Sequence, residues 1–292
     1  MIVASTRAEL RAARGLSPGP VVLVPTMGAL HDGHRVLLGR ARELAGRTGT
    51  VAVSIFVNPL QFGPSEDLDR YPRTLDADLK ACEAEHVDLV FAPSVREMYP
   101  GQQLVMVDPG PAGEILEGEF RPGFFRGVLT VVLKLFSLVR PDIAVFGQKD
   151  AQQLVLVRQM TADFALGVEI EAVPTVRAAD GLALSSRNKY LSSSERTVAP
   201  VLNQALAAGA AAAKGGPGAV LEAARRVLAT AGDSLKVDYL ALVDAGTYGP
   251  VRDGDSDFKG AAVLAIAARL GGTRLIDNVI IRFGTERDAA DD

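Results

Sequence analysis

The feature that most constrains the fold is an alternation of short apolar runs with helix-like stretches, from Val21 to about residue 175. Such an alternation is typical of an open, mostly parallel sheet with helices on both faces. The expected strands are Val21–Val24, Val51–Val57, Val87–Phe91, Ile143–Phe146 and Val168–Val173, and the expected helices are Arg35–Leu44, Leu75–Glu85, Gly127–Leu138 and Gln152–Thr161. The sequence therefore predicts an α/β fold with a doubly wound parallel sheet, whose ligands bind beyond the carboxyl ends of the strands.

The pattern changes after Val173, where a polar loop leads into an Ala-rich region. We expect helices over Ser194–Lys214 and Ala219–Ala231 with a break at Gly215–Gly218, and then strands at Val237–Val243, Ala261–Ala268 and Leu275–Ile281. Helices followed by strands indicate a smaller C-terminal α+β domain. We predict a first domain over 1–178 and a second over 179–292 that closes over the site, with a frayed polar tail at 285–292.

Composition restricts the class of protein. The chain has 292 residues, 31 basic and 35 acidic, and a net charge of −4, which argues against nucleic acid as the main partner. A single cysteine, Cys82, allows no internal disulfide and fits a reducing compartment. No apolar run reaches membrane-spanning length, and the charged N-terminus is unlike a signal peptide. We therefore expect a cytoplasmic protein with no membrane partner.

The run Pro25–His34 stands where the first expected strand turns into a helix and contains His31 and His34. Unpaired backbone N–H groups and the helix dipole favour an anion at such a turn, and Gly28 and Gly33 allow close approach to the backbone. The two histidines, three residues apart, share a face if both are helical. Phosphate binding is favoured, with a histidine stabilising charge during nucleotidyl transfer.

Two other interpretations of the histidines remain open. A His-x-x-His pair can bind zinc, but a zinc site needs a third protein ligand, and neither Cys82 on a helix nor His86 in a turn is clearly placed for it. The pair can also simply cap a helix.

Three further segments carry polar side chains beside expected strand ends. Gly147–Gln153 contains Lys149, a mobile charge suited to phosphate, and Asp150, which can cap a helix or bind ribose hydroxyls. Gln152 and Gln153 are adjacent, so only one of them can face a cleft. Asp180–Asn188 offers hydroxyls and an arginine for a polyphosphate, and Phe56–Phe62 offers an amide pair for a small ligand. Taken alone, Asp180–Asn188 is better explained as a polar interdomain loop, and the other two segments are equally compatible with an ordinary turn.

Taken together, these segments resemble the pantothenate synthetase (pantoate–β-alanine ligase) family, within the HIGH-type nucleotidyltransferase superfamily. The resemblance covers nearly the whole chain and is densest over residues 20–190. It is carried by Val24–His34, Ser54–Phe62, Glu66–Leu75, Gly127–Leu138, Phe146–Val155 and Asp180–Asn188. It implies a Rossmann-like first domain and a homodimer in the coenzyme A pathway.

The resemblance also implies an AMP-forming ligase reaction in two steps. ATP and pantoate first give pantoyl adenylate and pyrophosphate, with Mg²⁺ required. The amine of β-alanine then attacks the activated carbonyl, releasing pantothenate and AMP. Positioning and charge stabilisation would account for most of the catalysis, and exclusion of water would protect the mixed anhydride.

Residue roles follow from the same resemblance. It implies His34, Lys149 and Arg187 as catalytic residues, with His34 as a proton donor and His31 beside the phosphates. The implied pantoate ligands are Gln61 and Gln153, and Gln61 also borders the β-alanine site. The implied ATP-binding residues are Met27, Gly28, Ala29, Leu30, His31, Asp32, Gly33, His34, Gly147, Gln148, Lys149, Asp150, Val176, Leu184, Ser185, Ser186 and Arg187.

Several positions depart from the family pattern. Phe124 stands where histidine is common, Gln148 where glutamate is common, Ala151 where an aromatic is common and Leu184 where methionine is frequent. Ala77 interrupts the acidic run expected near magnesium, so we assign no protein ligand to the metal. Phosphates and water would hold the ion.

Two other functions compete with this one. A related nucleotidyltransferase could act on a phosphorylated small molecule, although neutral Gln61 and Gln153 suit a phosphate poorly. A non-enzymatic nucleotide sensor would not need both Lys149 and His34. Pyrophosphate release on addition of pantoate would exclude the sensor.

Overall fold

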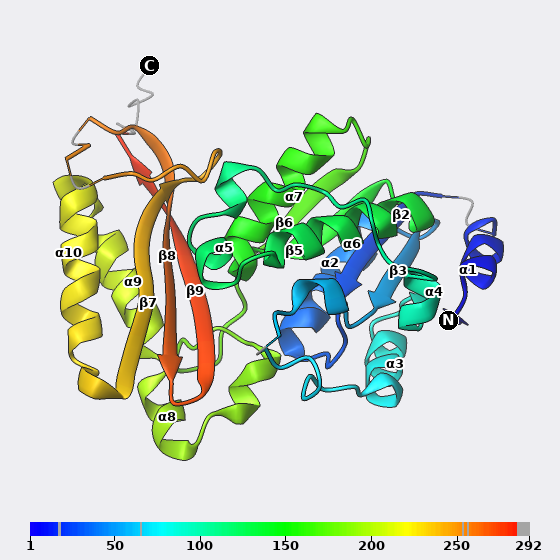
Figure 1. The fold of residues 1–292 in the computed structure, drawn as a ribbon, viewed down its shortest axis with the longest axis horizontal. Helices are drawn as coiled ribbons and strands as arrows, with labels where there is room; N and C mark the ends of the chain where they lie inside the picture. Colours follow the sequence, from blue (N-terminus) through cyan, green and yellow to red (C-terminus); the bar gives the residue numbers. More distant parts are fainter. Residues whose placement is uncertain (17–18, 65, 253, 256, 285–292) are drawn as a thin grey trace. The chain divides into compact units, whose positions relative to one another are not determined.

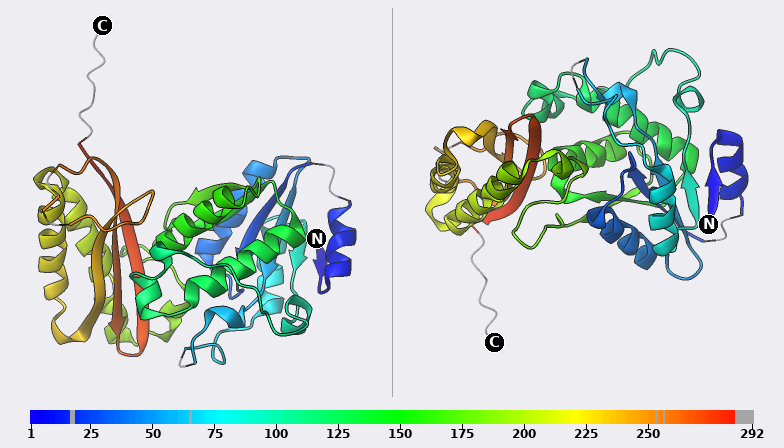
Figure 2. Two further views of the ribbon diagram at one scale, coloured as in Figure 1. Left: turned by 45° about the horizontal axis from the view of Figure 1, so that its top comes forward. Right: turned by 90° about the horizontal axis from the view of Figure 1, so that it is seen from below.

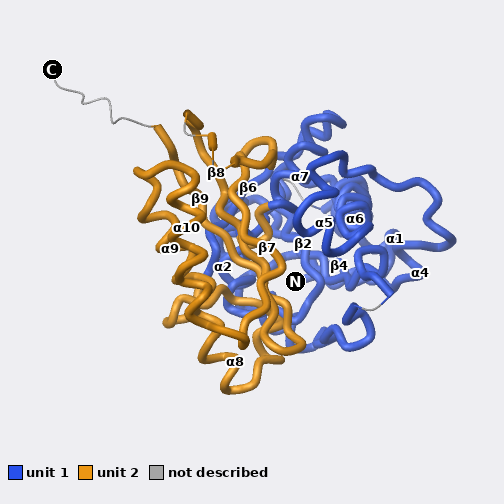
Figure 3. Tube along the Cα trace, turned by 60° about the vertical axis from the view of Figure 1, so that its left-hand side comes forward, with its two compact units in different colours: residues 1–148, 152–176 blue, residues 149–151, 177–292 orange. Residues whose placement is uncertain are grey.

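The computed structural model describes residues 1–16, 19–64, 66–252, 254–255 and 257–284, so the expected frayed tail lies outside the described residues. The described chain divides into two compact units (Figure 3). The first comprises Met1–Gln148 and Gln152–Val176, and the second comprises Lys149–Ala151 and the chain from Arg177 onward.

The first unit is built on a six-stranded parallel sheet in the order β1-β4-β3-β2-β5-β6 (Figure 1). Its strands are β1 (Ile2–Ala4), β2 (Val21–Thr26), β3 (Thr50–Ile55), β4 (Leu89–Phe91), β5 (Ile143–Gly147) and β6 (Glu169–Val173). Its α-helices are α1 (Arg7–Arg14), α2 (Asp32–Ala45), α3 (Leu75–Ala84), α4 (Val95–Met98), α5 (Glu117–Phe120), α6 (Phe124–Val139) and α7 (Ala151–Asp163). The predicted doubly wound parallel sheet is confirmed.

Alternate side chains of each strand enter two different cores. Val21 and Leu23 pack with apolar residues of α1, α6 and α7, whereas Val22 and Val24 pack with those of α2 and α3. Because successive strand residues point to opposite faces, strands that are buried on both faces must be apolar throughout, as β2 is. Helices therefore cover both faces of the sheet (Figure 2).

The second unit contains a three-stranded antiparallel sheet, β7-β8-β9, with helices packed against it. Its elements are α8 (Ser193–Val198), α9 (Val201–Ala211), α10 (Gly216–Ala229), β7 (Leu235–Asp244), β8 (Gly260–Leu270) and β9 (Thr273–Phe283). Leu202 and Leu206 of α9 and Val220 of α10 share a core with Leu264 and Ile266 of β8. The predicted smaller α+β domain is confirmed.

Some local predictions were wrong. The single helical stretch expected over Ser194–Lys214 is interrupted at Ala199 and Pro200, because proline has no N–H to continue a helix. The expected break at Gly215–Gly218 is shorter, since α10 already starts at Gly216, and Pro217 suits its first turn. Neither β1 nor α1 was predicted, although Thr6 and Glu9 form a capping box at the start of α1.

Candidate active site

The first unit has a topological switch point between β2 and β5. From β2 the chain proceeds outward through β3 and β4, whereas β5 pairs with the opposite edge of β2 and leads to β6. Ligands of doubly wound sheets bind at such a point, beyond the carboxyl ends of the strands. Met27 follows β2 there, and Gly147 ends β5.

A buried carboxylate shapes the loop between β2 and α2. Asp78 of α3 is 2 % exposed and accepts hydrogen bonds from the backbone N–H groups of Ala29 at 3.0 Å and Leu30 at 2.8 Å. Gly28 has φ +82°, and a Cβ atom there would lie 2.9 Å from an Asp78 oxygen. Ala29 also has a positive φ, +51°, which costs free energy for a non-glycine residue. Asp78 thus holds a strained loop in place.

The two histidines cap α2. His31 is the N-cap residue, and its Nδ1 accepts from Gly33 N–H at 3.1 Å. His34 in the first turn accepts from His31 N–H through its own Nδ1 at 3.3 Å, and the ring centroids lie 4.1 Å apart. The condition for a shared helical face is not met, because His31 has extended backbone angles outside the helix, and the capping interpretation describes the pair.

This reciprocal cap determines the tautomer of a neutral ring. A nitrogen that accepts a hydrogen bond carries no hydrogen, so each Nδ1 is bare and each Nε2 carries the proton. Both rings are thereby defined as Nε2–H donors at a helix N-terminus. Such donors suit an anion, which the helix dipole also favours.

Gln61 lies in a buried amide cluster after β3. Its Oε1 accepts from Asn58 Nδ2 at 3.1 Å, and its Nε2 donates to the sulfur of Met27 at 3.1 Å. Asn58 in turn accepts from the Tyr99 hydroxyl at 2.8 Å, and burial raises the pKa of that phenol. The structure therefore brings Gln61 and Met27 together from the ends of adjacent strands.

Close packing of α6 supports the same cluster. Asn58 Nδ2 also donates to the carbonyl of Gly127 at 3.1 Å. A Cβ atom on Gly127 would lie only 2.1 Å from the carbonyl oxygen of Leu60, so only glycine permits this approach.

Gln152 and Gln153 have different surroundings, as their adjacency predicted. Gln152 is buried and donates to the carbonyls of Ala112 at 2.7 Å and Ile115 at 2.9 Å, while its Oε1 accepts from Glu117 N–H at 3.2 Å. Gln153 is half-buried, and its side chain forms no hydrogen bond with the described residues. Gln152 therefore has a structural role, and Gln153 is the member of the pair available to a ligand.

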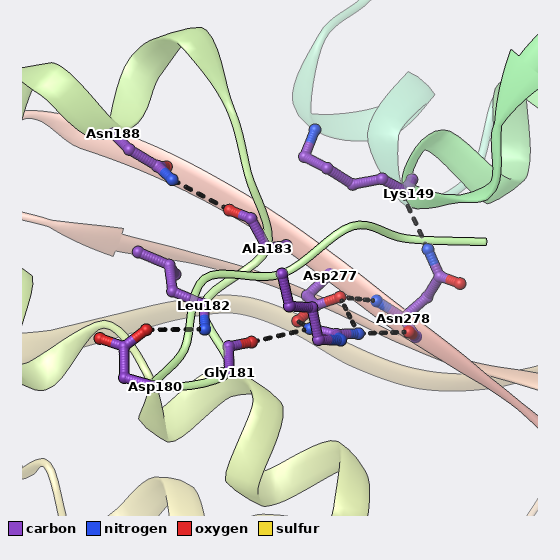
Figure 4. A network of polar contacts seen from close by, with 9 residues as sticks. Lys149, Asp180, Gly181, Leu182, Ala183, Asn188, Asp277 and Asn278 are labelled. Carbon is purple, nitrogen blue, oxygen red and sulfur yellow. Dashed lines mark hydrogen bonds and ion pairs between the residues drawn. The ribbon is translucent and has the colours of Figure 1, made fainter. Parts of the chain in front are cut away.

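Lys149 and Asp150 belong to the 3₁₀ turn Gln148–Asp150 between β5 and α7. Lys149 Nζ lies 3.7 Å from an Asp150 carboxylate oxygen, and both side chains are partly exposed. The carbonyl oxygen of Lys149 accepts a hydrogen bond from Asn278 of β9 at 2.8 Å (Figure 4).

The predicted phosphate loop lies in the second unit. Ser185 caps the 3₁₀ helix Ser186–Tyr190 by accepting from Arg187 N–H at 3.3 Å. Asn188 donates to the carbonyl of Ala183 at 3.0 Å. Leu184 and Ser186 are half-buried here, as is Val176 at the end of the first unit.

Zinc binding receives no support from the described residues. They contain no group of three or more His, Cys, Asp or Glu side chains that could hold a metal ion. Cys82 is buried on α3, and its thiol pKa is raised to about 11, chiefly by burial and further by the charge of Asp78. His86 lies in the turn after α3, as predicted.

A membrane span needs a helix of sufficient length and hydropathy. No helix within the described ranges is long and apolar enough to cross a membrane.

Sequence reasoning missed four residues that organise these segments. Asp78 was noted only as part of an acidic run, and Arg177, Asp277 and Asn278 were not singled out. A buried carboxylate or amide is recognised by its partners, and those partners are distant in sequence. The pattern around each of these residues carried no signal of its own.

The fold and these segments define an α/β protein in which a histidine-capped helix N-terminus lies at the switch point of a doubly wound sheet. The family model for pantoate-beta-alanine ligase matches residues 2–280, and the chain belongs to this family.

Named relatives are similar to this chain along nearly its whole length. The pantothenate synthetase of Thermobifida fusca (strain YX) is 60 % identical over 287 residues, covering 95 % of each chain. The crystal structure of pantothenate synthetase from Thermus thermophilus superposes with a TM-score of 0.87 at 46 % identity, covering 96 % of this chain and 99 % of that one.

A third relative was solved with ligands. The pantoate-beta-alanine ligase from Francisella tularensis, complexed with beta-gamma ATP and beta-alanine, has a TM-score of 0.77 at 32 % identity. The superposition covers 96 % of this chain and 97 % of the Francisella tularensis chain.

Proposed function

We propose that this chain condenses pantoate with β-alanine in an ATP-dependent reaction. The carboxylate of pantoate attacks the α-phosphorus of ATP, and pyrophosphate leaves. The amine of β-alanine then attacks the acyl carbon of pantoyl adenylate and forms a C–N bond. The acyl C–O bond breaks, AMP leaves with its electron pair, and the nitrogen loses a proton to give the amide. Adenylation is needed because a carboxylate is a poor electrophile and hydroxide or oxide a poor leaving group.

The observation that carries this proposal is the reciprocal histidine cap at the start of α2. It presents Nε2–H donors of His31 and His34 where the helix dipole favours an anion. Donors held in place before the reaction stabilise charge that develops on a transferring phosphoryl group without reorganising. We assign His34 as the proton donor and His31 as a neighbour of the phosphates.

The remaining ATP contacts are assigned to the loop after β2, the turn after β5 and the loop that ends at Arg187. Lys149 is a compact charge for phosphate, and Asp150 carries a carboxylate for ribose hydroxyls. Arg187 is proposed as a further catalytic cation for the triphosphate. The other proposed nucleotide contacts are Met27, Gly28, Ala29, Leu30, Asp32, Gly33, Gly147, Gln148, Val176, Leu184, Ser185 and Ser186.

Pantoate is assigned to Gln61 and Gln153, with β-alanine beside Gln61. Neutral amides suit the hydroxyls and the carboxylate of pantoate, whereas a phosphorylated acceptor would favour arginine or lysine. The half-buried side chain of Gln153, which forms no hydrogen bond with the described residues, supports this assignment.

Magnesium is proposed to arrive with the nucleotide. The carboxylate of Asp78 is occupied by backbone N–H groups, and Asp76 is exposed. This donor set fits an ion held by phosphates and water rather than one enclosed by protein ligands. When bound, the ion would neutralise phosphate charge.

We also propose that the protein is a cytoplasmic homodimer. The buried, free Cys82 is compatible with a reducing compartment. The dimer is inferred from the family alone, and sedimentation equilibrium of the purified chain tests it.

The deciding experiment is exchange of labelled pyrophosphate into ATP, with and without pantoate. We expect exchange only when pantoate is present. Exchange without pantoate, or with a phosphorylated acceptor in its place, would point to a different nucleotidyltransferase. ATP binding without any exchange would point to a sensor.

A further inference from the structure

Two adjacent residues of β9, Asp277 and Asn278, are polar and each only 3 % exposed. Burial of polar groups costs free energy unless hydrogen bonds compensate, so the partners of such residues reveal what they hold. The partners of this pair lie in the segments proposed to bind the nucleotide (Figure 4).

Asp277 holds the base of the loop that ends at Arg187. Its carboxylate forms a two-fold pair with the Arg177 guanidinium, with N···O distances of 2.5 and 2.9 Å. The same guanidinium donates to the carbonyl of Gly181 at 3.1 Å and to that of Asn278 at 3.4 Å. Arg177 thus ties the turn at Gly181 to β9.

That turn is itself closed by short-range bonds. Arg177 and Ala183 form an isolated antiparallel bridge, and Ala178 N–H donates to the carbonyl of Leu182 at 2.8 Å. Asn188 donates back to the carbonyl of Ala183 at 3.0 Å. A displacement of Arg177 would therefore be transmitted to the 3₁₀ helix that contains Arg187.

Asn278 holds Lys149. Its side-chain amide donates to the Lys149 carbonyl oxygen at 2.8 Å and fixes the backbone from which the lysine side chain extends. The side chain of Lys149 points away from this bond in Figure 4. An amide is required because an ionised carboxylate accepts hydrogen bonds and cannot donate to a carbonyl.

We propose that Asp277 and Asn278 are positioning residues, which set the Arg187 loop and Lys149 from a single strand of the second unit. This inference rests on the proposed function, because it takes Lys149 and Arg187 as phosphate ligands. Misplacement of a catalytic group by about 1 Å can cost roughly 10²-fold in rate, so a support of this kind affects turnover.

The test compares Asn278→Asp and Asp277→Asn with Asp238→Asn. Asp238 of β7 provides a matched control, because its side chain is 4 % exposed and pairs with Arg269 at 3.2 Å and Arg274 at 2.7 Å. Loss of that pair should lower the melting temperature without moving Lys149. We measure the melting temperature, kcat and KM of pantoate-dependent exchange, and affinity for ATP and for adenosine by calorimetry.

We expect Asn278→Asp to lower kcat roughly tenfold to a hundredfold and to weaken ATP more than adenosine. Asp277→Asn should act in the same direction, whereas Asp238→Asn should keep kcat within about twofold at a temperature where it is folded. In a Lys149→Ala background, Asn278→Asp should add little further loss, since coupled residues are not additive.

Wild-type kcat and ATP affinity in Asn278→Asp would overturn the proposal, as would an equal loss of kcat in Asp238→Asn. Full additivity with Lys149→Ala would also overturn it. If the wild-type chain binds ATP but shows no exchange, the proposed function fails, and the difference between ATP and adenosine binding in Asn278→Asp still decides the positioning role.

Discussion

The loop after β2 and the loop that ends at Arg187 are both proposed to meet phosphate, but they are held in different ways. In the first, His31 and His34 cap each other across three residues, and one buried carboxylate binds the adjacent backbone. In the second, Arg177 reaches Asp277 a hundred residues away. The histidine cap of the first loop is therefore local in sequence, and its carboxylate comes from a helix of the same unit, 49 residues after Ala29. The second loop depends on a strand 100 residues away.

This difference matters for what mutation can reveal. A locally capped histidine combines a structural atom, Nδ1, and a proposed chemical atom, Nε2, in one ring. In the second unit the two tasks belong to different residues, since Asn278 holds the backbone of Lys149. The ammonium of Lys149, 3.7 Å from Asp150, is the group proposed to contact phosphate. In the first region a substitution must keep an acceptor at the position of Nδ1 and remove Nε2. In the second region the supporting residue and the proposed catalytic residue can be replaced separately.

The largest effect is expected at His34. His34→Ala should reduce pantoate-dependent exchange by roughly 10²–10³-fold, the scale of losing one charge-stabilising donor. His34→Asn places an amide oxygen near the position of Nδ1 and keeps an acceptor for His31 N–H, but it has nothing at Nε2. We expect it to be as inactive as His34→Ala and to melt closer to wild type. Activity in His34→Asn would reduce the histidine to a helix cap.

The next largest effect is expected at Lys149, whose backbone is held by Asn278 of the second unit. Lys149→Ala should lose on the order of 10²-fold in exchange, and Lys149→Arg should also be poor, because a planar guanidinium does not replace a compact ammonium. The second half-reaction, measured with supplied pantoyl adenylate and β-alanine, should be impaired as well. Full turnover from the adenylate would confine the role of Lys149 to the first step.

A smaller effect is expected for the adjacent glutamines. Gln153→Ala should raise the KM for pantoate by an amount equivalent to about 1–3 kcal/mol and leave ATP affinity intact. Gln152→Ala should instead lower the free energy of unfolding by about 1–3 kcal/mol, because it leaves buried backbone groups unpaired. Chemical denaturation and steady-state kinetics of both variants test this split. Weakened ATP binding in Gln153→Ala would transfer that residue to the nucleotide site.

The sequence predicted the parallel sheet because its strands are apolar on both faces, and the strand-to-helix turns because glycine and charge follow them. It also predicted that Gln152 and Gln153 would differ. It did not distinguish which glutamine is buried, because that depends on the carbonyls of Ala112 and Ile115. Capping by the histidine pair was one of the interpretations left open, but a spacing of three residues did not show that His31 lies just outside the helix.

The positions that depart from the family pattern show the same limit. Phe124, where histidine is common, lies under the Arg121 guanidinium at 3.6 Å, and Arg121 forms a two-fold pair with Glu66 at 2.7 and 2.8 Å. A cation over an aromatic ring is favourable, so Phe124 has a structural role in this chain. The pair of Arg121 with Glu66 joins residues 55 positions apart, so the local sequence around Phe124 could not reveal what holds the guanidinium over the ring.

The smallest expected effect concerns the charge that holds the first loop. Asp78 contributes to the raised pKa of the Cys82 thiol, after the larger contribution of burial. Asp78→Asn removes that negative charge, so the thiolate becomes less unfavourable and the pKa of Cys82 should fall below about 11 while staying above 9.0. The ¹³Cβ chemical shift of the single cysteine, followed against pH, measures it. Asp76→Asn, in the same helical turn but exposed, is the control and should leave the pKa unchanged.

The same titration predicts a pH dependence of stability. The folded protein binds the thiol proton more tightly than the unfolded chain, whose pKa is near 9.0, so the contribution of Cys82 is complete below pH 9 and is lost as pH rises toward 11. Cys82→Ala should flatten that part of the stability profile, and Asp78→Asn should make the loss smaller and end it at a lower pH, because only the folded-state pKa falls. An unchanged thiol pKa in Asp78→Asn would mean that burial alone raises the pKa of Cys82, and that Asp78 acts on the loop after β2 through its hydrogen bonds only.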